Sequence, residues 1–150
     1  MQKVRIIYGS SGGNTEFSCE RVAQKLTELG FFVELVQAKR ASKADFALSP
    51  DLKLLILASP TYGHGLLEQY MEILLGSCQD LDLTGQKAAI IGLGDMKYDA
   101  DYFIESAKLL KEFLVKTGAD VVGFPLMIAK SPFIHTAAID KWAVALTKLL

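Results

Sequence analysis

Apolar residues along the chain follow two patterns that alternate from one end to the other. Short runs made up mainly of apolar residues, which are typical of buried strands, occupy residues 4–8, 31–36, 52–59, 87–92 and 119–128. Between these runs, apolar residues recur at spacings of three and four, which predicts helices with one buried face. The members of these stripes are Cys19, Val22, Ala23 and Leu26; Leu67, Tyr70, Met71 and Leu74; Phe103, Ala107, Leu110 and Leu114; and Ile139, Trp142, Ala143 and Leu146.

This alternation predicts an α/β fold, in which five β-α units form a parallel sheet with helices on both faces, a three-layer α/β/α sandwich. Residues 37–51 lack a clear stripe and are expected to hold a short helix or a loop. The 150 residues contain no linker or repeat, so a single domain over residues 1–150 is predicted. In such sheets the crossovers are right-handed, and ligands bind beyond the carboxyl ends of the strands. Ligand-binding residues are therefore expected in the loops after the first, third and fourth strands.

Composition argues against several classes of function. The 16 Lys and Arg residues nearly balance the 17 Asp and Glu residues, and a net charge of −1 gives no overall basic field to attract nucleic acid or anionic lipid. No stretch approaches the roughly 18 apolar residues of a membrane span, and the first apolar run is too short for a signal peptide. Cys19 and Cys78 are far apart and form no metal-binding or redox pattern, so two reduced, packed cysteines are expected. A cytoplasmic protein without nucleic-acid or membrane partners is predicted.

The first of the three loops, residues 9–16, reads Gly-Ser-Ser-Gly-Gly-Asn-Thr-Glu and leads straight into a predicted helix. Backbone N–H groups at a helix start, together with hydroxyl and amide side chains, favour a phosphate. The same composition also suits a flexible turn that ends in an Asn or Thr cap. No Lys or Arg occurs between Arg5 and Arg21, so a phosphate in this loop would be held by neutral donors only.

Better-known motifs do not fit this loop. No Gly-Lys-Ser/Thr follows, as Walker A requires, and the glycine spacing departs from the Rossmann fingerprint, so neither ATP nor NAD is indicated. A phosphorelay receiver needs an aspartate where the chain has Ser-Pro at 59–60. Residues 9–13 match the nucleophile elbow of hydrolases, with Ser11 as nucleophile and His64 or His135 as base. That elbow belongs deep in a longer sheet, whereas this one follows the first strand.

The other two loops pair glycines with aromatic residues. They read SPTYGHG at 59–65 and GLGDMKYDADYF at 92–103. Glycine allows the backbone to change conformation or to approach a ligand closely, and an aromatic ring offers a flat face for stacking. The three loops together provide one phosphate cradle and two aromatic platforms at one edge of the sheet. A phosphate attached to a broad planar ring suits that arrangement.

The same three segments, with YGSSGGNTE at 8–16, resemble those of the flavodoxins, and the resemblance covers the whole chain. Because no long loop is inserted between the fifth strand and the last helix, the chain is similar to the short-chain branch. The resemblance implies a flavodoxin-like five-stranded parallel sheet and non-covalently bound FMN. It further implies a low-potential one-electron carrier that works between a reductase and acceptor enzymes and has no substrate of its own.

The resemblance also implies which residues bind FMN. Gly63 would matter through its carbonyl, which accepts a hydrogen bond from flavin N5–H after one electron has arrived and so stabilises the neutral semiquinone. Gly12 stands where the family usually has a threonine, so one hydroxyl is missing. Tyr98 is preferred to Tyr102 as the outer stacking residue. The implied residues are Ser10, Ser11, Gly12, Gly13, Asn14 and Thr15 for the phosphate; Pro60, Thr61, Tyr62, Gly63 and His64 in the second loop; and Gly94, Asp95, Tyr98, Tyr102 and Phe103 in the third.

Two other functions stay open at this point. An FMN-dependent NAD(P)H:quinone-type reductase would need a substrate pocket beside the flavin, and the chain has no inserted loop to build one. An interaction module that kept the fold but lost the flavin is the other. His64 also has two interpretations, an inert exposed histidine or a group whose titration makes the flavin potential depend on pH.

Local charge predicts where partners dock. Segments 9–16, 59–72 and 92–105 hold seven acids against one base, a net −6, so the rest of the chain carries −1 − (−6) = +5. An acidic rim around the flavin would steer basic redox partners to it, whereas solvated helix faces are the plain alternative. A monomer without a metal site is expected. The charged residues of the rim are Glu16, Glu68, Glu72, Asp95, Lys97, Asp99, Asp101 and Glu105.

Overall fold

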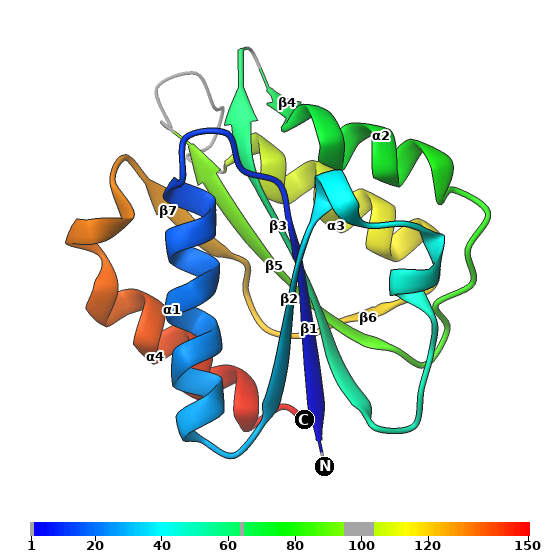
Figure 1. Cartoon of the computed structure of the whole chain (residues 1–150), viewed down its shortest axis with the longest axis horizontal. Helices are drawn as coiled ribbons and strands as arrows, with labels where there is room; N and C mark the ends of the chain where they lie inside the picture. Colours follow the sequence, from blue (N-terminus) through cyan, green and yellow to red (C-terminus); the bar gives the residue numbers. More distant parts are fainter. Residues whose placement is uncertain (1, 64, 95–103) are drawn as a thin grey trace.

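A computed structural model describes residues 2–63, 65–94 and 104–150 (Figure 1). Its strands form one sheet in the order β2-β1-β3-β5-β6, with β7 also pairing with β5 and β4 pairing with the end of β3. All pairings are parallel except that of β3 with β4. The strands are β1 (Lys3–Tyr8), β2 (Phe32–Gln37), β3 (Leu52–Tyr62), β4 (Leu66–Leu67), β5 (Lys87–Gly94), β6 (Asp120–Val121) and β7 (Leu126–Ala129).

Helices cover both faces of this sheet, as predicted. One face carries α1 and α4 and the other carries α2 and α3, which Figure 1 shows on opposite sides of the strands. Of residues 37–51, which lacked a clear pattern, Gln37 ends β2 and the rest form two short 3-10 turns and a loop. The helices are α1 (Asn14–Glu28), α2 (Gln69–Ser77), α3 (Glu105–Lys116) and α4 (Thr136–Thr147), and the 3-10 turns are η1 (Ala38–Arg40), η2 (Lys43–Phe46) and η5 (Pro132–Ile134).

Two predictions of local structure were wrong. The fifth strand, expected to be continuous over residues 119–128, is split into β6 and β7. Gly123 has a φ of 70° and Pro125 has no N–H group, so neither continues a strand ladder. The stripe that began at Leu67 was also misplaced: Leu67 lies in β4, the helix begins at Gln69, and Tyr70 is 41 % exposed. Phe103, the first member of the next stripe, lies outside the described residues.

Alternate residues of the central strands fill two separate cores. Leu54 and Ile56 of β3 pack under α1 and α4, whereas Leu55 and Leu57 pack under α2 and α3. Each cysteine is a free, buried thiol, Cys19 in the first core and Cys78 in the second. Burial raises the pKa of the Cys19 thiol well above its usual range, which disfavours the reactive thiolate. The prediction of two reduced, packed cysteines is confirmed.

Candidate functional site

The strand order places a topological switch point, the position at which open parallel sheets have their binding crevice, at the carboxyl end of this sheet. From β1 the chain crosses through α1 to β2 on one side, whereas from β3 it crosses through α2 to β5 on the other. The two connections therefore diverge between the carboxyl ends of β1 and β3. Ligands of open parallel sheets bind at such a point. The crevice lies between the first and second predicted loops.

The first loop presents unpaired backbone groups to this crevice. The cap residue of α1, Gly13, has a φ of 86°, and no side chain bonds the N–H groups of the first helical turn. The hydroxyl of Ser10 instead accepts the N–H of Gly13 at 3.2 Å. A Cβ atom added at Gly12 or Gly13 would meet open space, and Thr15 is buried at the start of the helix. The loop therefore fits a phosphate, whose oxygen atoms would accept hydrogen bonds from the N–H groups of the first helical turn. Its exposed residues are Ser11, Gly12, Gly13 and Asn14.

The second loop is a short hairpin at the end of β3. Tyr62 pairs with Leu66, and Gly63 and Gly65 have φ values of 54° and 105°, which glycine adopts without strain. His64, between them, lies outside the described residues. Tyr62 is 37 % exposed, so its ring is available to a ligand at the crevice.

Thr61 and the end of β5 lie against the start of α3. The hydroxyl of Thr61 accepts the N–H of Ser106 at 3.2 Å, so this side chain turns toward α3. A Cβ atom on Gly94 would lie 3.1 Å from the same hydroxyl oxygen, which shows how closely the ends of β3 and β5 pack. The remaining predicted contacts of the third loop, namely Asp95, Tyr98, Tyr102 and Phe103, lie outside the described residues.

Glu68, counted above as a member of the acidic rim, is instead a buried structural residue, 2 % exposed. Its carboxylate accepts the N–H of Tyr70 at 2.8 Å and the N–H of Met71 at 3.1 Å, and so caps α2. Its own N–H donates to the hydroxyl of Ser59 at 3.0 Å. A Cβ atom on Gly9 would lie only 2.6 Å from its carboxylate oxygen. Glu68 therefore joins the first loop to the second. The position of an acid directly before a predicted helix was the feature of the sequence that could have identified Glu68 as a cap.

Basic residues that the charge count left out also lie at this edge. Lys39 and Arg40 follow β2, and Lys130, with a φ of 64°, follows β7 and donates its N–H to the carbonyl of Gly94 at 3.1 Å. With Glu68 buried, the described part of the edge carries acids and bases in similar number. The acidic rim stays a prediction that depends on residues 95–101. The unburied acids of the described part are Glu16, Glu72 and Glu105.

Tyr8 and Glu16 flank the first loop and contact each other. The hydroxyl of Tyr8 donates to Oε1 of Glu16 at 3.3 Å. Burial, and then the charge of Glu16, raise the pKa of Tyr8 to about 12. The stability that this group contributes is complete below the ordinary tyrosine pKa of about 10 and is lost as the pH rises through the folded-state value.

A Tyr8→Phe variant should therefore lose less unfolding free energy than the parent protein when the pH is raised from neutrality to alkaline values. Between about pH 9 and about pH 11.5 the parent should lose about 2 kcal/mol more unfolding free energy than the variant. Urea denaturation of both proteins at the two pH values measures this difference. Equal losses would show that Tyr8 titrates normally.

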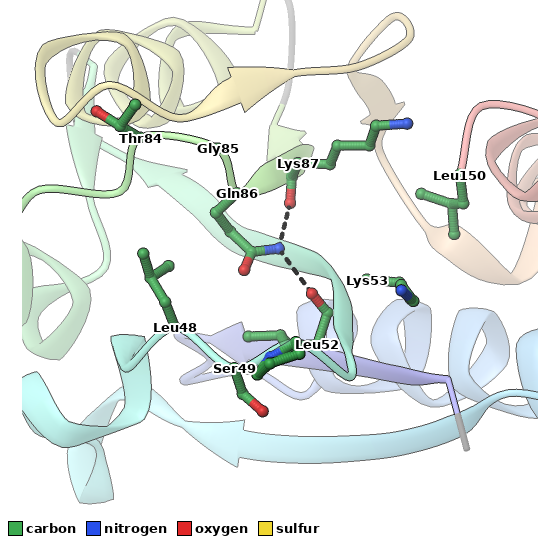
Figure 2. Close-up of a pocket in the computed structure, with 10 residues that line it drawn as sticks. Leu48, Ser49, Leu52, Lys53, Thr84, Gly85, Gln86, Lys87 and Leu150 are labelled. Atoms are coloured by element: carbon green, nitrogen blue, oxygen red, sulfur yellow. Dashed lines mark hydrogen bonds between the residues drawn. The ribbon is translucent and has the colours of Figure 1, made fainter.

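A cavity of about 570 Å³ lies at the opposite, amino ends of β3 and β5 (Figure 2). Gln86 crosses it and donates through Nε2 to the carbonyls of Lys87, at 3.0 Å, and Leu52, at 3.3 Å. Along β3, Lys53 lies on the same face of the sheet as the residues of the second core, whereas along β5, Lys87 lies on the same face as the residues of the first core. The two ammonium groups therefore point to opposite faces of the sheet. The cavity offers no converging charges for a ligand.

Other kinds of site find no support in the described part of the chain. No group of three or more His, Cys, Asp or Glu side chains there is placed to hold a metal. His135, considered above as the base of a nucleophile elbow, bonds the carbonyl of Ala129 at 3.0 Å through Nε2. Within residues 2–63, 65–94 and 104–150, no helix has the length and apolar character needed to cross a membrane.

Comparison with known proteins decides the family. The family model described as flavodoxin matches residues 6–142. The chain belongs to the flavodoxin family. It is 34 % identical over 134 residues to the flavodoxin of Maridesulfovibrio salexigens, with 88 % of this chain and 89 % of that protein covered. It is 30 % identical over 146 residues to the flavodoxin of Nitratidesulfovibrio vulgaris, with 95 % of each covered. The crystal structure of oxidised flavodoxin 2 from Bacillus cereus superposes with a TM-score of 0.88 at 27 % identity, covering 99 % of both chains.

Membership in the flavodoxin family confirms the predicted fold and function. Flavodoxins are FMN-binding proteins that carry electrons to and from redox partners and have no substrate of their own. The predicted FMN-dependent electron carrier is therefore confirmed, and the NAD(P)H-dependent reductase is not favoured.

Proposed function

We propose that this flavodoxin binds FMN in the crevice between β1 and β3. The phosphate lies on the first loop, and the ring lies against Tyr62. The observation that carries this assignment is the start of α1, where Gly13 takes a left-handed conformation and the first helical turn has no side-chain cap. When bound there, FMN supplies a reversible one-electron couple. The chain's own residues bind the cofactor, orient it and limit its exposure to water.

The phosphate contacts divide between side chains and backbone. Ser10, Ser11 and Asn14 supply neutral donors from the loop, Thr15 supplies one from the helix start, and Gly12 contributes only its N–H group. The unpaired N–H groups and the dipole of α1 favour the dianion.

Gly63 offers a backbone group that can change direction at the ring edge. Its φ of 54° lies in a region that glycine enters and leaves at little cost, and a Cβ atom there would meet open space. Its carbonyl is therefore able to turn toward a ring N–H group and accept a hydrogen bond in one redox state. Pro60, Thr61 and Gly94 form the rigid base from which this turn projects.

Redox partners dock at the edge of the ring that the loops leave open. A reductase donor and an acceptor enzyme reach it transiently, and the sequence of the third loop supplies the acids Asp95, Asp99 and Asp101 for steering basic partners. We place the protein in the cytoplasm as a monomer, because long-range steering of this kind suits a freely diffusing carrier. A rate of reduction by a basic partner that falls as salt rises supports this docking surface, and a rate indifferent to salt contradicts it.

Cofactor titration tests the proposed site. The purified protein should show a flavin absorption spectrum and release FMN on denaturation. The apoprotein should bind FMN at least about tenfold more tightly than riboflavin, which lacks only the phosphate, because several charge-assisted hydrogen bonds are lost without it. Fluorescence quenching measures both dissociation constants. Equal affinities for FMN and riboflavin would show that the first loop does not bind the phosphate.

Gly12 offers a test of the missing hydroxyl. A Gly12→Thr variant should bind FMN more tightly by several-fold, since a neutral hydrogen bond is worth on the order of 1 kcal/mol and open space surrounds this position. Riboflavin affinity should not change. Gly12→Ala is the matched control, because it also restricts the backbone relative to glycine but adds no donor. A gain that Gly12→Ala reproduces would assign the effect to the backbone.

A further inference from the structure

The first loop must hold a dianion close to an acidic side chain. Glu16 lies in the first turn of α1, and the loop itself supplies no cation. A carboxylate within about 10 Å of a phosphate weakens its binding by Coulomb repulsion. The uncapped helix start favours the dianion, but no cation of the loop offsets Glu16, so a charge that does so would come from elsewhere in the fold.

Arg40 lies in the right place to supply it. A cavity of about 400 Å³ beside the first loop is lined by both Arg40 and Glu16, together with Tyr8, Leu35, Val36 and Gln37. Arg40 reaches this cavity because η1 follows β2 directly, and β2 is the neighbour of β1 in the sheet. The hydroxyl of Tyr8 holds the carboxylate of Glu16 on this side of α1.

Arg40 also differs from its basic neighbours, which are already engaged. Lys43 contacts Asp80 at 2.8 Å, Arg5 contacts Glu34 at 3.0 Å, and Lys39 lies 5.5 Å from the centre of the Tyr70 ring. Arg40 takes part in none of the ion pairs that join described residues. Its side chain is exposed, and no ion pair with a described residue neutralises its charge, so its field extends to the cavity that it lines and to the loop beside it.

We propose that Arg40 is the charge-compensating residue of the phosphate site: it offsets Glu16 and lets a loop of neutral donors discriminate FMN from riboflavin. The inference rests on the proposed placement of the phosphate on the first loop. Arg40 acts through the field at the phosphate and is a positioning and specificity residue rather than a direct ligand. A charge that acts over about 10 Å at low ionic strength changes the affinity for a dianion by about three- to tenfold.

Four variants separate this field from general effects of charge or folding. Arg40→Gln removes the cation, Glu16→Gln removes the acid, and a third variant carries both changes. Lys53→Gln changes the net charge as Arg40→Gln does, but at the amino end of the sheet. Dissociation constants for FMN and for riboflavin are measured on each apoprotein at about 20 mM and about 1 M salt, where the screening lengths are roughly 20 Å and 3 Å.

At low salt, Arg40→Gln should weaken FMN binding about three- to tenfold and leave riboflavin binding unchanged. Glu16→Gln should strengthen FMN binding by a similar factor, the double variant should return close to the parent, and Lys53→Gln should change affinity less than twofold. At about 1 M salt the differences should collapse, since the charges are screened.

Three results would overturn the proposal. They are an Arg40→Gln variant with unchanged FMN affinity, equal losses for FMN and riboflavin, and a loss that survives high salt. Failure of the proposed site itself looks different, because the parent protein would then show no preference for FMN over riboflavin. Thermal unfolding of each apoprotein separates a folding defect from a change in the field.

Discussion

Replacing Glu68 with alanine is expected to lower the free energy of unfolding of the apoprotein by about 2–4 kcal/mol. The carboxylate is buried and satisfies the N–H groups of Tyr70 and Met71 at the start of α2. Removing it leaves these donors unpaired in the interior and opens space against Gly9. Glu68→Gln keeps one acceptor oxygen of similar shape and should lose only about 1 kcal/mol. Urea denaturation measures both values.

The matched control is Glu72→Ala, which removes an exposed acid from the first turn of the same helix. It should change stability by no more than about 0.5–1 kcal/mol, since only a surface interaction with the helix dipole is lost. Because Glu68 joins the first loop to the second, Glu68→Ala should also weaken FMN binding while Glu72→Ala does not. A Glu68→Ala protein as stable as the Glu72→Ala protein would show that the buried carboxylate contributes nothing.

The parts of the fold that were predicted correctly depend on local pattern alone. Residues 4–8 and 87–92 are apolar apart from Arg5 and Lys87 because these strands are buried on both faces, and such a pattern is visible without knowledge of the rest of the fold. The misplaced stripe at Leu67 shows that local pattern does not determine where a helix begins. The spacing of apolar residues there is helical, but the helix begins only after Glu68, whose position is fixed by hydrogen bonds to Ser59 and to the helix start.

The sequence was sufficient to predict which loops lie at the candidate site, but not the contacts between them. The order of strands brings the three loops to one edge, which sequence pattern suffices to predict. Contacts between distant segments, such as Gly9 against Glu68 or Arg40 in the cavity of Glu16, depend on packing that one sequence does not display. Counting charge by segment misassigned single residues for the same reason, while the acidic rim itself stays a prediction. It included an acid that is buried and omitted bases after β2 and β7 that share the edge.

A second large effect is expected from Tyr62, the aromatic residue of the second loop. Tyr62→Ala should weaken binding of FMN and riboflavin alike, by about fivefold to 100-fold, because stacking of a planar ring on an aromatic side chain is worth about 1–3 kcal/mol. Tyr62→Trp should strengthen both, since the larger ring covers more of the flavin. Fluorescence quenching with the two ligands measures the four dissociation constants.

The equal response to both ligands is what distinguishes this role from that of the first loop. In the proposed site, substitutions at Gly12 and Arg40 affect the phosphate and should change FMN binding only, whereas a substitution at Tyr62 affects the ring that both ligands share. Tyr70→Ala serves as the control, because Tyr70 is exposed to a similar degree, 41 % against 37 %, but lies on α2 beneath Lys39. If Tyr70→Ala weakened flavin binding as much as Tyr62→Ala, the ring would lie on α2 rather than against the hairpin at the end of β3.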